Sequence, residues 1–286
     1  MTKHQKGILF IILSAFCFSL MNMFVRLSGD LPSMQKAFFR NFISLLVATV
    51  LLWKSGIPFR CKKENLGLLL TRSTFGTIGI LCNFYAISHL NLADASMLNK
   101  LSPFFAILFS FFFLKEKVKP VQAICVFGAF IGSLCIIKPS FDFAAALPAI
   151  LGFLGGMAAG AAYTAVRVLG LRGEKGPFIV FFFSAFSCLV TLPTLLFSYV
   201  PMTFLQLLYL LLAGLCAAGG QFAITAAYTN APAREISIYD YTIVIFAAVW
   251  SFLLWAEMPD WVSVLGYVII FGSSLAMFLY NKRAGA

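Results

Sequence analysis

Charged residues are scarce in this chain. Asp, Glu, Lys and Arg together make up 11% of its 286 residues, whereas a soluble domain holds roughly 25%. Histidine is rarer still, with only His4 and His89. These shortages exclude an ordinary soluble enzyme and leave no convergent groups for acid–base or metal chemistry. A membrane-embedded enzyme, acting for example on lipid headgroups, stays only a remote alternative.

Two further absences limit the functions that this protein can have. The chain has no Gly-x-x-x-x-Gly-Lys-Ser/Thr phosphate-binding loop, so we expect no direct drive by ATP. Six of its cysteines lie inside apolar runs at no metal-ligand spacing and are expected to be small buried hydrophobes. We therefore expect no catalytic residues, no metal and no cofactor.

Apolar residues dominate what is present. They make up 61% of the chain, mean hydropathy is +0.95, and 33 residues are Phe. Because a membrane-spanning helix needs about 20 mainly apolar residues, the sequence predicts an all-α membrane protein with ten transmembrane helices. The predicted spans are 7–28, 34–53, 66–88, 92–114, 120–138, 146–168, 177–199, 203–226, 235–256 and 261–281.

The positive charges predict the orientation of these spans. With a cytoplasmic N-terminus, the inner segments hold most of the Lys and Arg residues and the outer ends hold only Arg26, Lys36, Arg40 and Lys138. Basic residues collect in cytoplasmic loops, so we expect a cytoplasmic (inner) membrane protein with both termini cytoplasmic. The net charge of +11 then reflects topology and contact with membrane lipid, and we expect no nucleic-acid partner.

The two halves of the chain align at a shift of 141 residues. Arg26 meets Arg167, Ser96 meets Ser237, and Glu116 meets Glu257. The second helix of each half aligns better at a shift of 143. Each half has five predicted spans, so the second half must enter the membrane inverted. We predict two inverted five-helix repeats, residues 1–142 and 143–286, with a binding site between them as in many secondary transporters.

Several segments carry a family resemblance. Arg72-Ser-Thr-Phe-Gly opens the third span, and Asn83 to Ser96 follows it. Leu101-Ser-Pro-Phe-Phe leads to Leu114-Lys-Glu-Lys. These segments resemble the drug/metabolite transporter superfamily, specifically its EamA-type members, over nearly the whole chain. Lys115-Glu116 replaces the usual Gly-Glu, and Tyr239-Asp240-Tyr241 replaces an apolar stretch. The resemblance implies a ten-helix carrier of small organic molecules and does not fix the substrate.

Intramembrane charges are the first candidates for substrate binding, because a charge in hydrocarbon is costly unless it is paired or hydrated. Asp240 is predicted about 9 Å inside the ninth span, as a counter-ion for a substrate ammonium, a proton carrier, or a structural partner of Arg72. Lys100 is predicted roughly 12 Å inside the fourth span, facing a cavity or snorkelling. Its neighbour Asn99 is the repeat mate of Asp240, and Pro103 can open that helix.

Arg72 is predicted ~9 Å inside the third span, in a cavity or reaching headgroups. Arg26 and Arg40, near the outer face, are expected to pair with Asp30 or Asp94. Uncharged side chains could line the cavity or only bond neighbouring helices, and tyrosines could hold a cation over the ring face. The uncharged candidates are Asn22, Asn83, Tyr85, Tyr163, Gln221, Tyr239 and Tyr241.

Gly152, Gly156 and Gly160 recur every fourth residue on the sixth span and predict close helix packing within the monomer, with dimer contact as the alternative. A zwitterion fits the charges best, with Lys100 or Arg72 for a carboxylate and Asp240 for an ammonium. We therefore expect a secondary transporter of an amino acid or derivative, as a monomer or homodimer. The alternative is an exchanger or importer of a nucleoside-like cofactor such as S-adenosylmethionine.

Overall fold

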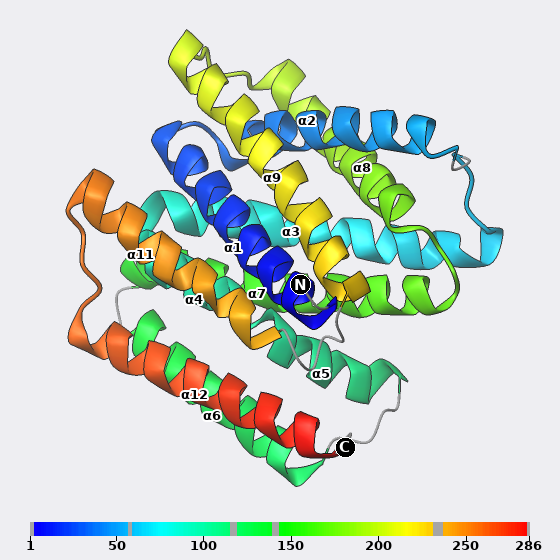
Figure 1. The fold of residues 1–286 in the computed structure, drawn as a ribbon. Coiled ribbons are helices and arrows are strands. Elements are labelled where there is room, and N and C mark those ends of the chain that lie inside the picture. Colours follow the sequence, from blue (N-terminus) through cyan, green and yellow to red (C-terminus); the bar gives the residue numbers. More distant parts are fainter. Residues whose placement is uncertain (1–2, 57–58, 115–118, 139–142, 231–236, 285–286) are drawn as a thin grey trace.

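The computed structural model describes residues 3–56, 59–114, 119–138, 143–230 and 237–284. Within these ranges the secondary structure is helical (Figure 1). The helices are α1 (Lys3–Leu27), α2 (Ser33–Lys54), α3 (Leu66–His89), α4 (Leu92–Asn99), α5 (Ser102–Leu114), α6 (Pro120–Ile137), α7 (Phe143–Leu171), α8 (Gly176–Phe197), α9 (Phe204–Asn230), α11 (Thr242–Trp255) and α12 (Trp261–Ala284). Two 3₁₀ turns, η1 (Lys63–Asn65) and η2 (Ser237–Tyr241), precede α3 and α11.

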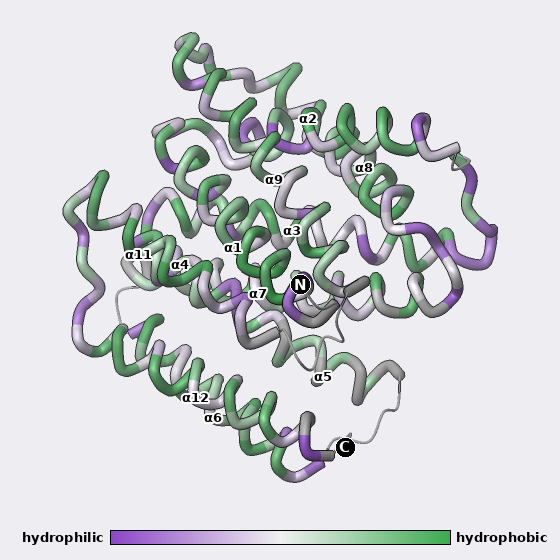
Figure 2. The backbone as a smooth tube through the Cα atoms, viewed as in Figure 1, coloured by the Kyte–Doolittle hydropathy of each residue, from purple (hydrophilic) through white to green (hydrophobic). Residues whose placement is uncertain are grey.

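These elements match the ten predicted spans. Seven helices of the described chain are long and apolar enough to cross a membrane on their own: α1, α2, α6, α7, α8, α9 and α12. The fourth span is divided into α4 and α5, and the ninth consists of η2 and α11. Hydrophilic residues gather at helix ends and in connections, while the helices are mainly apolar (Figure 2). The chain is thus an all-α, multi-pass membrane protein of two inverted five-helix repeats.

The pattern of helix packing follows the repeat. Helix α1 packs along α9, and its counterpart α7 packs along α3, the counterpart of α9. Helix α2 packs against its own counterpart α8, and α6 against its own counterpart α12 (Figure 1). If each helix is replaced by its counterpart, the same pairs of helices are in contact. This is the property of a bundle with two-fold pseudo-symmetry.

The closest contacts between helices are made at glycine residues. A Cβ atom added at Gly156 of α7 would lie 2.5 Å from the carbonyl oxygen of Leu98, and one at Gly160 would lie 2.5 Å from Cβ of Phe105. The glycine face of α7 thus packs directly on the fourth span, on both sides of its interruption. This confirms the predicted packing surface within the monomer, since small residues let backbones approach closely.

Gly156→Ala is expected to lower the free energy of unfolding by about 1–3 kcal/mol, because the added methyl group has no room beside the Leu98 carbonyl. Gly170→Ala on the same helix is the matched control, since no atom lies within 4 Å of its added Cβ. Thermal unfolding in detergent compares the two variants. Equal stability of both would contradict the close packing.

Candidate functional site

The fourth span is interrupted at Lys100 and Leu101. Pro103 has no backbone N–H, and the amide of Phe104 bonds the Leu101 carbonyl at 3.0 Å instead of continuing the α-helical ladder to Lys100. The carbonyl oxygen of Lys100 therefore does not accept the usual α-helical hydrogen bond from Phe104. It accepts a hydrogen bond of 3.1 Å from the hydroxyl of Tyr241, which is buried in the opposite repeat. The predicted opening beside Pro103 is therefore present.

The ninth span begins at the corresponding position with the 3₁₀ turn η2, which carries Asp240 and Tyr241. The ammonium group of Lys100 donates to the Asp240 carboxylate and forms an ion pair with it. Both side chains are at least 85% shielded from solvent. Lys100 and Tyr241 are mates at the 141-residue shift, as are Asn99 and Asp240, so this junction lies on the pseudo-two-fold axis between the halves.

A cavity of about 110 Å³ lies beside the junction and is lined by helices of both repeats. Several of its lining residues are also mates at the 141-residue shift, including Asn22 with Tyr163 and Ile80 with Gln221. The cavity is therefore central, as expected for a site between inverted repeats. Its polar lining residues are Asn22, Arg40, Arg72, Asn83, Asn99, Lys100, Tyr163 and Gln221.

Two buried arginines dominate the charge of this cavity. Arg40 of α2 is 4% exposed and Arg72 of α3 is 7% exposed. Arg40 donates to Oδ1 of Asn41 at 2.6 Å, and the Arg72 guanidinium lies over the Phe183 ring at 3.9 Å. The Nε atoms of both arginines are buried with no hydrogen-bond partner. Neither guanidinium has an ion-pair partner among the residues that the structure describes.

Unsatisfied acceptors lie in the same cavity. Oδ1 of Asn22 and Oδ1 of Asn83 are buried without a hydrogen-bond partner. Asn22 comes from α1 and Asn83 from α3. Because buried polar groups in native proteins are nearly always bonded, these amides and the two guanidinium groups are ready to bind a polar ligand with both donor and acceptor groups.

Most predicted site residues meet here, with clear exceptions. Lys100, Arg72, Asn99, Asn22, Asn83, Tyr163 and Gln221 line the cavity. The others have different surroundings: Asp240 binds Lys100, Tyr241 bonds the Lys100 backbone, Tyr239 is 36% exposed on η2, and Tyr85 stacks on His89. The predicted pairing of Asp240 with Arg72 is wrong, because Asp240 pairs with Lys100 through Oδ2 and its buried Oδ1 has no hydrogen-bond partner.

Arg40 was the residue that sequence reasoning placed incorrectly. We expected it near the outer face with Asp30 or Asp94, but it is buried and lines the central cavity. Asp94 instead accepts a hydrogen bond from Tyr267 at 2.6 Å. The position of Arg40 in the sequence already indicates that it is buried, because it lies seven residues inside α2, about 10 Å along the helix axis.

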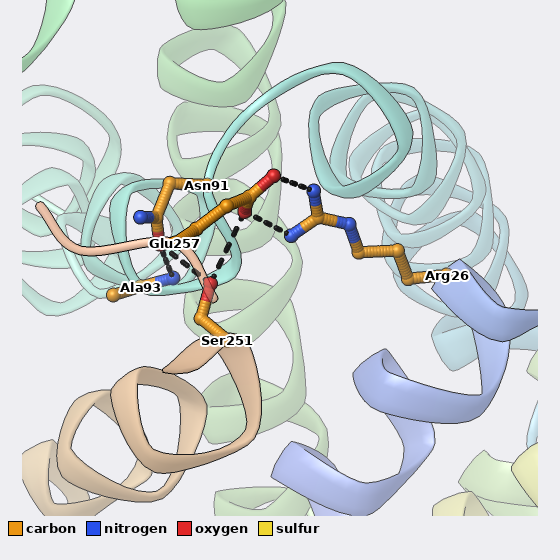
Figure 3. Close-up of polar contacts among 5 residues, drawn as sticks. All are labelled: Arg26, Asn91, Ala93, Ser251 and Glu257. Carbon is orange, nitrogen blue, oxygen red and sulfur yellow. Dashed lines mark hydrogen bonds and ion pairs between the residues drawn. The ribbon is translucent and has the colours of Figure 1, made fainter. Parts of the chain in front are cut away.

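Arg26 also has a partner that the sequence did not indicate. Its guanidinium makes two hydrogen bonds of 2.7 Å to the carboxylate of Glu257, 231 residues away, rather than pairing with Asp30 or Asp94 (Figure 3). The same guanidinium lies 4.4 Å from the centre of the Trp255 ring. This bidentate pair ties the end of α1 to the end of α11, at the end of the bundle that we call the distal end.

The ion pair continues into a polar network (Figure 3). Ser251 lies 3.3 Å from the Glu257 carboxylate and 3.1 Å from Oδ1 of Asn91. That oxygen also accepts from the amide of Ala93 at 2.9 Å and so caps α4. The distal network, Arg26, Glu257, Ser251 and Asn91, thus connects α1 and α11 with the start of the interrupted fourth span.

A second, larger recess of about 530 Å³ lies at the opposite end, among the connections before η1 and α8. It is lined by Arg60, Lys62, Glu174 and Lys175. We favour the central cavity as the functional site, because the recess holds exposed charges whereas the cavity holds buried unpaired ones. Among the described residues, no group of three or more His, Cys, Asp and Glu could hold a metal ion.

Comparison with known proteins agrees with this architecture. The model of the EamA-like transporter family matches residues 5–138 and again residues 146–279. The chain belongs to the EamA-like transporter family. The second match starts and ends 141 residues after the first, the shift at which the halves align. Membership places the protein in the drug/metabolite transporter superfamily, as the resemblance implied.

Its relatives are named as small-molecule transporters. A pseudopaline exporter, CntI, of Pseudomonas aeruginosa (strain UCBPP-PA14) is 34% identical over 97% of this chain and 98% of the relative. Human solute carrier family 35 member G1 is 27% identical over 94% of this chain and 78% of the relative. A riboflavin transporter of Brucella anthropi is 26% identical over 89% of this chain and 90% of the relative.

A solved crystal structure supports the fold alone. It superposes with a TM-score of 0.67 at 16% identity and covers 97% of this chain and 99% of that chain. Together, the family and these names show that the protein is a multi-pass membrane transporter of a small molecule.

The Arg26–Glu257 pair is expected to have a coupling energy of about 1–2 kcal/mol, because its geometry is bidentate and it is partly shielded. A double-mutant cycle with Arg26→Gln and Glu257→Gln, followed by thermal unfolding, measures it. The control cycle is Lys138→Gln with Asp260→Asn, an exposed pair expected to couple by less than about 1 kcal/mol. Equal coupling in both cycles would contradict a special role for the distal pair.

Proposed function

We propose that this protein is a secondary transporter that moves an amino acid or amino-acid derivative across the cytoplasmic membrane by alternating access. The observation that carries the proposal is the central cavity, where buried, unsatisfied donors and acceptors lie beside the junction of two interrupted spans. Interrupted spans at a repeat interface are the usual position of substrate sites in secondary transporters.

The lining chemistry suits a zwitterion. Arg40 and Arg72 supply guanidinium donors for a carboxylate, which binds guanidinium with two parallel hydrogen bonds. Oδ1 of Asn22 and Oδ1 of Asn83 supply acceptors for an ammonium group. Asp240 is engaged by Lys100 in the present structure. In this proposal a proton or a substrate ammonium displaces Lys100 during the cycle.

Alternating access requires one end of the bundle to be closed at a time. The distal network closes the end of α1 against the end of α11. With both termini in the cytoplasm, the distal end is the outer one, and the distal network closes the bundle on that side. Export then requires the Arg26–Glu257 pair to break. This orientation rests on the excess of Lys and Arg in the inner segments.

Substrate size distinguishes the two substrate hypotheses. A cavity of about 110 Å³ is smaller than the roughly 300–1,000 Å³ of drug-sized ligand sites. It favours an amino-acid-sized cargo over a nucleoside-like cofactor such as S-adenosylmethionine. The relative named as a riboflavin transporter favours testing the larger class as well. We propose no chemical conversion of the cargo, and no nucleic-acid partner.

A liposome uptake panel tests the proposal. The purified protein is reconstituted, and amino acids, polyamines and nucleoside cofactors are offered with and without a pH gradient. We expect saturable uptake of amino-acid-sized compounds, recovered unaltered by mass spectrometry. Chemical conversion of the recovered compound would point to an enzyme, and preferential uptake of nucleoside cofactors would favour the alternative.

Asp240→Asn is expected to reduce transport at least about tenfold, because it leaves the Lys100 ammonium buried without its counter-ion. Flux is normalised to the amount of folded protein in the membrane. Asp260→Asn is the matched control, because Asp260 is exposed and pairs with Lys138 outside the cavity. The double variant Lys100→Gln with Asp240→Asn removes both charges and keeps the test valid if the single variant folds poorly. Flux at the wild-type level in Asp240→Asn would remove this carboxylate from the mechanism.

A further inference from the structure

The central cavity has an excess of positive charge. Arg40, Arg72 and Lys100 line it, while Asp240 neutralises only Lys100. No Asp or Glu is present among the described residues that line it. Two guanidinium groups are therefore buried in the bundle without a protein counter-ion in the described part of the chain.

Such an arrangement is costly for a protein that only has to fold. A buried charge is normally paired, because the loss of hydration exceeds what weaker contacts return. Arg40 has the neutral amide of Asn41, and Arg72 has the face of Phe183. These contacts hold the side chains in place without neutralising them, and each Nε atom still has no acceptor.

The position of Arg72 is built into the helix. Its Nη1 atom lies 2.2 Å from where a Cβ would be at Gly76, one turn further along α3. The Phe183 ring lies 2.9 Å from that same point. A methyl group at this position would displace the guanidinium or the ring, so Gly76 leaves room for this cation beside Phe183.

Among the described residues that line the cavity, the charged groups come from one repeat only. Arg40, Arg72 and Lys100 belong to the first half, and the mate of Arg40 in the second half, at the 143-residue shift, is Phe183. The lining residues of the first repeat therefore include the cations, and those of the second repeat include Tyr163, Phe183 and Gln221. A ligand that fits this lining has its anionic groups beside the cations of the first repeat.

We propose that the substrate class is a metabolite with two carboxylate groups, one bound by Arg40 and one by Arg72. This inference rests on the proposed function, because it concerns the substrate of the same cavity. Each carboxylate neutralises one guanidinium and accepts from its unpartnered Nε atom. A substrate with a single carboxylate leaves one buried cation unpaired and binds more weakly.

Isosteric ligand pairs test this inference directly. Glutamate is compared with glutamine, and aspartate with asparagine, by ligand-induced shifts in thermal unfolding and by liposome uptake. We expect the diacid of each pair to bind at least about tenfold more tightly than its amide, the loss expected when one charged hydrogen-bonding partner is removed. Equal binding of acid and amide would overturn the inference.

Variants assign the two carboxylates. Arg40→Gln and Arg72→Gln are each expected to abolish the preference for glutamate over glutamine, because either variant leaves one guanidinium for one carboxylate. Arg60→Gln, a change in an exposed loop arginine, is the matched control and keeps the preference. Gly76→Ala retains every charge but displaces the Arg72 guanidinium, so it is expected to reduce the preference without changing net charge. An unchanged preference in the three cavity variants would overturn the assignment.

The two proposals fail in different ways. Uptake of glutamine and other neutral amino acids, with no advantage for the diacids, overturns this inference and leaves the transport proposal standing. Diacid binding that depends on Arg40 and Arg72, without flux of any amino acid into liposomes, supports the site and contradicts the proposed function.

Discussion

The fold depends on one constraint of the hydrocarbon layer: every backbone polar group must find a partner inside the protein. Interrupting the fourth span releases the carbonyl of Lys100, and the hydroxyl of Tyr241 from the opposite repeat satisfies it. The side chain of Lys100 is neutralised by the adjacent Asp240. One break is thus stabilised by two residues of the corresponding break in the other half. This junction joins the two halves beside the cavity, which Asn99 and Lys100 line.

The symmetry of the backbone does not extend to the chemistry. Mates at the repeat shift line the cavity together, as Asn22 does with Tyr163. Their side chains differ, and the guanidinium groups belong to the first half alone. The shared backbone gives both halves the same packing geometry. The divergent side chains give the cavity cationic groups from the first half and, among the described lining residues, uncharged ones from the second.

The sequence predicted the ten spans, the repeat and the opening beside Pro103, because these follow from local composition and from the comparison of one half with the other. It predicted most of the cavity through the rarity of polar groups in apolar runs. It did not predict which charged side chains form ion pairs. Glu257 lies 231 residues from Arg26, and the two meet because α1 packs against α11. Arg40 was misplaced because the sequence does not show in which direction a long side chain seven residues inside a helix extends.

The bidentate geometry of the Arg26–Glu257 pair has a kinetic consequence. Two parallel hydrogen bonds between rigid planar groups are lost together when the planes separate, so few partly broken arrangements are stable. In the proposed transport cycle, separation of α1 from α11 requires both of these bonds to break together. Under the proposed alternating access, a gate without stable intermediates gives small solutes little time to leak across the membrane.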